Sequence, residues 1–199
     1  MSTGKTRLSR ERIAAAALAI ADKEGFDAVS MRRVAQELDA GAMSLYHYVK
    51  TKDDLMAVMD DALMGESLLP SLPKGWQRAV MAIARRTYAV FVRHPWAVVS
   101  MLSAPPGINA MRHMEQCLEA LAEAPMTNPQ KVALLATVDD FVFGHALRQS
   151  TPGAPATEFA AQQLASGAFP RLAKTFSKGP VPTTKNRFER GLQALINGL

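Results

Sequence analysis

The sequence contains one cysteine, Cys117, among its 199 residues. A single cysteine cannot form a disulfide within the chain, and this usage is typical of proteins that work in the reducing cytoplasm. We expect Cys117 to be a small buried apolar residue. The apolar runs stay well short of the ~18 residues that suggest a membrane-spanning helix, so we expect a soluble protein with no membrane partner. The basic residues at the start are expected to form a flexible arm over residues 1–8 rather than a secretory signal.

Sequence motifs that hold metals, cofactors or catalytic nucleophiles are also missing. There is no HExxH, no ExxH pair, no GxSxG and no GxGxxG, and "TGKT" lacks the earlier glycine and the preceding strand of a phosphate-binding loop. We therefore expect no metal, no cofactor and no enzymatic activity. The four histidines are scattered: His47, His94, His113 and His145. An all-α enzyme that uses Asp139, Asp140 and a nearby histidine is the catalytic alternative.

Several of these polar residues allow two interpretations. His94 is expected to bond free carbonyls at a helix end rather than to bind a ligand. His113 and His145 can line a pocket or be satisfied core histidines. Asp139 and Asp140 interrupt an apolar run, where a carboxylate must be paired, exposed or functional. A ligand anchor and a salt bridge between helices are both open for this pair.

The positive charge of the chain is concentrated near its start. The formal net charge is +5 and the pI is near 9.6, which allows an anionic partner without requiring one. Residues 1–52 contain nine Lys/Arg against six Asp/Glu, whereas residues 53–199 contain fourteen against twelve. The first quarter of the chain therefore carries more than half of the excess.

Helical periodicity recurs along the sequence and strand signals are nearly absent, which predicts an all-α fold. Capping residues mark the first helices. Ser9 can begin a helix that stops at Gly25, Ser30 can begin a short helix over 31–38, and Thr51 can begin a helix with an acidic first turn. These elements predict an N-terminal three-helix helix-turn-helix domain over residues 1–68.

The segment LPSLPKG, at 69–75, is the predicted domain boundary, and a larger C-terminal helical domain is expected over 69–199. With 48% hydrophobic residues, the chain can form a sizeable core. The periodicity predicts the following C-terminal helices, with an irregular connector between the last two: about 76–94, 96–102, 108–124, 128–150, 158–168 and 185–199.

The stretch AGAMSLYHYVKTKDDL, at 40–55, has the side chains that a DNA-reading helix needs. Two short helices joined by a tight turn form a helix-turn-helix, and the second must enter a major groove about 12 Å wide. Small residues at its start, Ala42 to Ser44, allow close approach and contact with base edges. Tyr46 and Tyr48 offer hydroxyl groups to phosphates, and Lys52 can clamp a phosphate at the next helix start.

Residues 9–65 closely resemble the N-terminal domain of tetracycline-repressor-like (TetR-family) transcription factors. The residues that carry the resemblance are Ala16, Ala17, Gly25, Ser30, Val34, Ala35, Leu38, Leu45, Tyr46, Lys52 and Leu55. Two features depart from the family pattern. Asp39 replaces a common glycine, and it is one of the few residue types that tolerate positive φ. The run YHYV places Tyr48 where a histidine is common.

Together, the residue chemistry and the resemblance predict contacts with double-stranded DNA. Arg32 can reach a guanine or touch a phosphate, and both interpretations are open. The predicted DNA-binding residues are Ser30, Arg32, Ala42, Met43, Ser44, Tyr46, His47, Tyr48 and Lys52.

The remainder of the chain resembles the tetracycline-repressor-type C-terminal domain through RHPW, PPG and the terminal RFERGLQALINGL. This resemblance implies a domain that dimerises and holds a small-molecule effector. The candidate pocket residues are Tyr88, Phe91, Trp96, Met101, Met111, Met114, Asp139 and Phe143. The candidate homodimer interface consists of Phe141, Gly144, His145, Phe188, Leu192, Leu195 and Ile196.

We therefore expect a homodimeric transcriptional repressor that a small molecule releases from a palindromic operator. The alternative is a DNA-binding regulator, activator or architectural protein that needs no effector.

Overall fold

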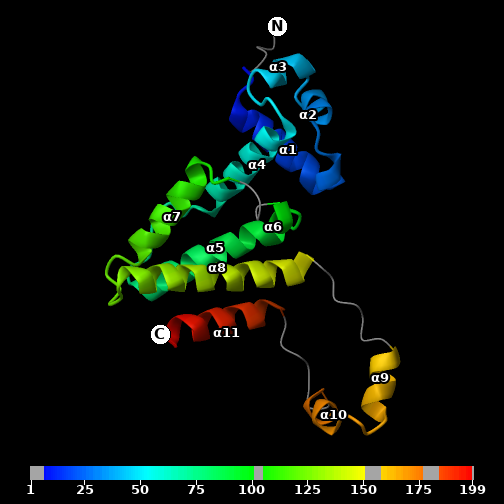
Figure 1. Ribbon diagram of the computed structural model, residues 1–199, viewed down its shortest axis with the longest axis vertical. Coiled ribbons are helices and arrows are strands. Elements are labelled where there is room, and N and C mark those ends of the chain that lie inside the picture. The colour runs from blue at the N-terminus through cyan, green and yellow to red at the C-terminus, as the bar shows by residue number, and fades with distance from the viewer. Residues whose placement is uncertain (1–6, 101–104, 151–157, 177–183, 199) are drawn as a thin grey trace.

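The computed structural model describes residues 7–100, 105–150, 158–176 and 184–198, and this part of the chain contains helices and no strand. The predicted all-α fold class is confirmed. The elements, shown in Figure 1, are α1 (Arg10–Glu24), η1 (Phe26–Ala28), α2 (Met31–Glu37), α3 (Ala42–Tyr46), α4 (Lys52–Ser67), α5 (Trp76–Arg93), α6 (Ala97–Ser100), α7 (Ile108–Ala120), α8 (Asn128–Ser150), α9 (Glu158–Ala165), α10 (Pro170–Phe176) and α11 (Thr184–Asn197).

The first helices begin and end where the capping residues predicted. The hydroxyl of Ser9 accepts a hydrogen bond from the backbone N–H of Arg12, and Ser30 caps α2 in the same way. Thr51 and Asp54 form a reciprocal capping box at the start of α4. Gly25 ends α1 with a φ of 92°, a conformation that glycine adopts without steric cost.

The turn between α2 and α3 depends on Asp39, which has a φ of 48°. This value lies in the left-handed region that aspartate tolerates better than most residues. The turn is closed by the N–H of Ala40, which donates to the carbonyl of Ala35 over 3.0 Å. The chain therefore reverses within a few residues and places α3 beside α2.

Helix α4 connects the two parts of the molecule. It packs on α1 at its first half and on α5 and α7 further along, as Figure 1 shows. Its buried residues Leu55, Met59 and Leu63 are 0% exposed, and they belong to one continuous apolar cluster that also includes buried residues of α1, α5, α7, α8 and α11. A displacement of α4 therefore affects both the N-terminal helix α1 and the C-terminal helices α5 and α7.

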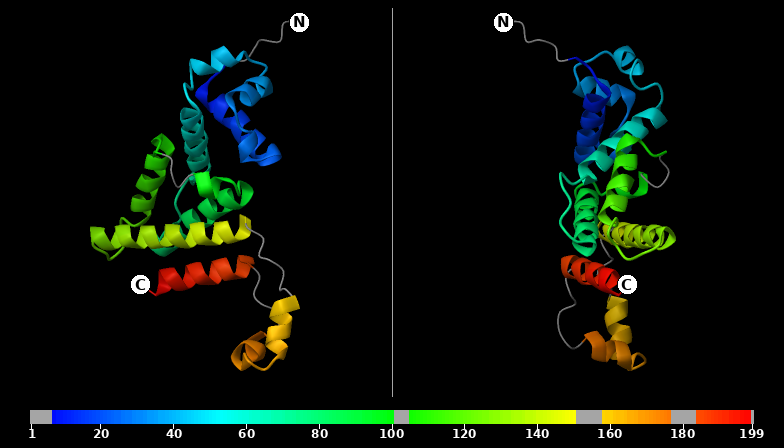
Figure 2. Two further views of the ribbon diagram at one scale, coloured as in Figure 1. Left: turned by 45° about the vertical axis from the view of Figure 1, so that its right-hand side comes forward. Right: turned by 90° about the vertical axis from the view of Figure 1, so that its left-hand side faces the viewer.

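One C-terminal segment differs from the predictions. Residues 170–176, predicted as part of an irregular connector, form α10. Helices α9 and α10 pack on each other and project away from α5, α8 and α11 (Figures 1 and 2). Within the described residues, no helix is both long enough and apolar enough to cross a membrane.

Candidate nucleic-acid interface and effector site

The leading edge of α3 is exposed, whereas its inner face is buried. Ala42, Met43 and Ser44 are exposed, and Met43 retains 77% of its accessible surface. Leu45 and Val49 are 0% exposed and anchor the helix and the following turn in the core. A rigidly held helix with small, protruding first residues has the geometry needed to approach base edges.

The end of α3 is held by a residue that the sequence reasoning missed. Arg10, in the first turn of α1, donates a hydrogen bond from Nη1 to the carbonyl of Tyr48 over 2.9 Å. Tyr48 is half-buried and packs on the core, whereas Tyr46 and His47 are exposed. A basic residue just after the Ser9 cap was the available signal for this contact.

The start of α4 presents two exposed cations. Lys50 and Lys52 flank the capping box, and the backbone N–H groups of Lys50 and Thr51 both donate to the Asp54 carboxylate, over 3.0 and 3.2 Å. These bonds fix the loop that leads from α3 to α4. The Lys52 side chain is exposed at a helix N-terminus, which is a favourable place for a phosphate.

The two arginines of α2 have different surroundings. Arg33 forms ion pairs with Glu24 and Glu37, at 2.6 and 2.9 Å, and these carboxylates raise its pKa. The charge of Arg33 is therefore paired with carboxylates of the same chain. Arg32 is exposed, as is Ser30, whose hydroxyl caps α2. Arg32 is thus the better placed of the two to meet DNA.

A cluster of polar side chains joins three C-terminal helices. The Thr87 hydroxyl of α5 lies 3.2 Å from His113 Nε2 of α7, and His113 Nδ1 lies 3.8 Å from the sulfur of Cys117. Burial lowers the pKa of His113, so its neutral form is favoured. Burial raises the pKa of the Cys117 thiol to about 12, and the charge of Asp139 of α8 adds to this effect.

Burial, and secondarily the charge of Asp140, raise the pKa of Asp139 to about 6. At neutral pH Asp139 is therefore mainly ionised, and its ionised form lowers the free energy of unfolding. Of the two interpretations of this carboxylate, the raised pKa fits a ligand anchor better than a salt bridge between helices, because a paired cation would lower the pKa of Asp139. The cluster of Thr87, His113, Cys117 and Asp139 is named the polar cluster below.

Comparison with known proteins follows the same division of the chain. Residues 13–59 match the family described as "Bacterial regulatory proteins, tetR family", and residues 69–199 match "Tetracyclin repressor-like, C-terminal domain". The chain belongs to the TetR family.

Several TetR-family relatives match nearly the whole chain. The HTH-type transcriptional repressor DrrR1 of Streptomyces coeruleorubidus is 36% identical over 98% of this chain and 78% of its own length. Apo ActR from Streptomyces coelicolor is 31% identical, with a TM-score of 0.80 and coverage of 96% of this chain and 94% of that one. ActR in complex with actinorhodin is 30% identical, with a TM-score of 0.79 and 97% coverage of both chains.

The predicted effector-pocket residues of this TetR-family chain are not all brought together. Met111 and Met114 of α7 are 61% and 48% exposed, so the single chain does not enclose them, and their place in an effector pocket stays a prediction. Phe91 is buried against Phe143, with ring centroids 4.8 Å apart, and both belong to the packed core. Met101 lies outside the described residues.

Two further candidates contact residues outside any shared pocket. Tyr88 stacks on Phe188 with centroids 4.0 Å apart, and burial raises its pKa. Trp96 stacks on Phe26, at 5.3 Å, near the end of α1. Of the predicted pocket residues, Asp139 is the one that joins the polar cluster. Sequence reasoning missed Thr87, because one threonine in an amphipathic helix gives no signal.

Two clefts lie elsewhere. One, of about 840 Å³, lies between α1, α4 and the start of α7, and its described lining includes none of the predicted pocket residues. The other, of about 560 Å³, lies between the start of α8 and the end of α11; its lining includes Ala133, Thr137, Ala194 and Leu195.

The predicted dimer residues divide into two groups. Phe188, Leu192 and Ile196 are at most 2% exposed and pack inside their own chain, which corrects their assignment to a surface between subunits. The physical reason is that α11 needs this stripe to attach to α5 and α8. The other predicted residues retain exposed surface: Phe141, Gly144, His145 and Leu195.

Proposed function

We propose that this TetR-family protein is a homodimeric transcriptional repressor that binds a palindromic operator and is released by a small molecule. The observation that carries the DNA-binding part is the exposed Met43 and Ser44 at the start of α3, above buried Leu45 and Val49. Exposed Arg32, Lys50 and Lys52 lie on neighbouring elements and supply charge for phosphate contacts.

Exposed apolar side chains support the homodimer. On α8, Val132 and Leu147 are 60% and 46% exposed, and the cleft beside α11 is lined mainly by apolar residues, among them Trp76, Met126 and Leu195. In the projecting segment, Phe159 of α9, Phe169 of the loop that follows and Leu172 of α10 are 68%, 43% and 48% exposed. Large apolar surfaces of this kind mark association sites in soluble proteins. In the proposed homodimer, the two α3 helices must lie about 34–36 Å apart to meet successive half-sites on one face of the duplex.

The polar cluster is the proposed effector site. Its helices supply a hydroxyl, a neutral imidazole and a carboxylate in an otherwise apolar interior. Such a set suits a mostly apolar molecule that carries hydrogen-bond donors. The relative ActR has been solved with actinorhodin and with (S)-DNPA, which supports a small-molecule effector here. Binding at this site lowers operator affinity by a coupling free energy of typically ~1–3 kcal/mol.

A titration of duplex DNA from the region upstream of the gene tests this function. We expect selective binding over scrambled DNA, a steep loss of affinity between two salt concentrations, and a stoichiometry of two chains per site. Mass spectrometry of co-purified molecules identifies effector candidates, each of which is then added to the complex. Binding without sequence preference would instead indicate an architectural protein, and a complex insensitive to all candidates would indicate the effector-independent regulator.

A further inference from the structure

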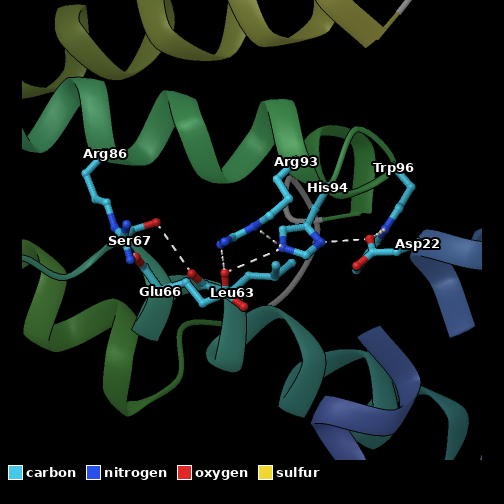
Figure 3. A network of polar contacts seen from close by, with 8 residues as sticks. All are labelled: Asp22, Leu63, Glu66, Ser67, Arg86, Arg93, His94 and Trp96. Atoms are coloured by element: carbon cyan, nitrogen blue, oxygen red, sulfur yellow. Dashed lines mark hydrogen bonds and ion pairs between the residues drawn. The ribbon is translucent and has the colours of Figure 1, made fainter. Parts of the chain in front are cut away.

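His94 joins the two parts of the chain through opposite nitrogens of one ring (Figure 3). It follows α5 directly and is 5% exposed. Its Nδ1 lies 2.7 Å from Asp22 Oδ1 of α1, and its Nε2 lies 3.0 Å from Arg93 Nε. Arginine Nε always carries a hydrogen, so Nε2 accepts and Nδ1 donates. The contacts therefore select one neutral tautomer, which bonds on both sides.

Helix α4 is attached to the same ring indirectly, through Glu66 and Arg93. The Glu66 carboxylate forms an ion pair with Arg93 and lies 3.5 Å from His94 Nε2. The carbonyl of Glu66 also accepts a hydrogen bond from Arg86 Nε over 2.6 Å. The last turn of α4 is thus fixed to α5 at a point that His94 shares.

Helix α1 is attached through Asp22. Besides His94, Asp22 Oδ1 accepts a hydrogen bond from Trp96 Nε1 over 2.8 Å, and Trp96 stacks on Phe26, just after α1. The short segment of Arg93, His94 and Trp96 therefore contacts the ends of both α1 and α4. Helices α2 and α3 lie between these two in the sequence; α2 packs on α1, and α3 packs on α2.

We propose that His94 is a positioning residue that sets the placement of the helix-turn-helix module on the C-terminal helices, and that effector control of DNA binding passes through it. The second claim, that effector control passes through His94, rests on the proposed function above. Thr87 of the polar cluster lies on the same helix, seven residues before His94, or about 10 Å at the rise of an α-helix. A rotation or shift of α5 at Thr87 therefore moves the ring, and the ring moves α1 and α4 together.

Other contacts between the modules provide a matched control. Asn109 of α7 bonds to Asp61 of α4 through its backbone N–H, at 2.7 Å, and its side-chain amide, at 3.1 and 3.2 Å. This contact holds α4 but leaves α1 untouched. Asn109→Ala therefore removes the two side-chain bonds to α4, keeps the backbone bond, and leaves the bridge from α1 to α4 intact.

The test measures the distance between the modules directly. Spin labels are placed at cysteines introduced at exposed Gln36 of α2 and exposed Glu119 of α7, and the buried Cys117 is left in place. Labelled chains are diluted into unlabelled protein, so that only distances within one chain are observed. The variants are His94→Leu, which removes both ring contacts but keeps an apolar side chain, and His94→Asn, whose amide can still donate to Asp22.

We expect one narrow distance distribution for the unmodified protein and for Asn109→Ala. His94→Leu should broaden it and weaken operator binding at least about fivefold, the lower range of typical coupling between sites. His94→Asn should restore most of the narrow distribution. This rescue separates a hydrogen-bonding role from simple packing, which Leu preserves better than Asn.

Three outcomes decide against the proposal or part of it. An unchanged distribution in His94→Leu would overturn it, and so would a broadened distribution with full operator affinity. If the unmodified protein shows no selective DNA binding, the proposed function and the regulatory part fail, while the distances still decide the positioning part. Should His94→Leu fail to fold, Asp22→Ala breaks the same contact from the side of α1 and is expected to give the same broadening.

Discussion

Gly191 of α11 lies against the ring of Phe141 in α8. A Cβ atom added to Gly191 would be 2.5 Å from Phe141 Cζ and 2.7 Å from Cε2, which is closer than real contacts allow. Phe141 also packs on His145 and Phe188, with ring centroids 4.2 and 5.6 Å away. The close approach of α8 and α11 therefore depends on the absence of a side chain at position 191.

Gly191→Ala should lower the free energy of unfolding by about 1–3 kcal/mol, the usual cost of overpacking a core. Denaturant unfolding followed by circular dichroism measures the change. The double variant Gly191→Ala/Phe141→Leu should recover part of the loss, because the smaller side chain gives the new methyl group room. Simple addition of the two single effects would show that this contact is not the cause.

If the proposed homodimer forms through α8, Gly144→Arg should separate its subunits without unfolding the chain. Gly144 is exposed on α8, and a Cβ there would meet no atom within 4 Å, so the single chain accepts a side chain. A long charged side chain in a two-fold interface meets its own copy and opposes association. Sedimentation should show monomers, and circular dichroism should show unchanged helix content. Unaltered association would place the dimer interface elsewhere.

Asp139→Asn should stabilise the protein near pH 7.5 and lose this advantage as the pH falls. The folded pKa of Asp139, about 6, lies above the ordinary value of 3.8, so the folded chain binds the proton more tightly than the unfolded chain. The penalty of the charged form is complete above pH 6 and disappears below about pH 4. A pKa change of this size corresponds to up to ~3 kcal/mol.

Unfolding measured at pH 7.5, 6 and 4 tests this prediction, with Asp140→Asn as the control. Asp140 is exposed and is the smaller cause of the raised pKa of Asp139, so its substitution should give a much smaller gain at pH 7.5. Equal effects of the two variants, or a gain for Asp139→Asn that does not change with pH, would show that burial of Asp139 is not responsible.

Lys52→Ala should weaken binding to all DNA sequences alike and reduce the salt slope of log K by about 1, the change expected when one phosphate contact is lost. Lys74→Ala is the control, because Lys74 is exposed in the loop before α5 and lies outside the predicted contacts. Titration at several salt concentrations provides the slopes. Loss of affinity for some sequences only would contradict a phosphate role for Lys52.

Local features of the fold were predictable from the sequence because their causes are local. Ser9, Ser30 and Thr51 cap helices through bonds to residues three positions away, and Leu45 and Val49 face inward by helical spacing. These signals placed the helix-turn-helix and the exposed start of α3.

Contacts between distant elements were not predictable. The apolar stripe of Phe188 and Leu192 indicates that something covers it, but periodicity cannot tell the same chain from a second subunit. His94 was expected to bond carbonyls at a helix end, whereas its partner is Asp22, 72 positions earlier. Such pairs depend on how whole helices pack together, and a single sequence carries no signal for that packing.

Reading of the DNA groove by the start of α3 is tested most directly by selection from a pool of random duplexes with the unmodified protein and with Ser44→Ala. We expect the unmodified protein to enrich a palindrome whose half-sites lie about one helical turn apart. Ser44→Ala should change the preferred base at one position in each half-site and leave the others unchanged. Absence of any enriched sequence, or an equal weakening at every position, would contradict groove reading by this helix.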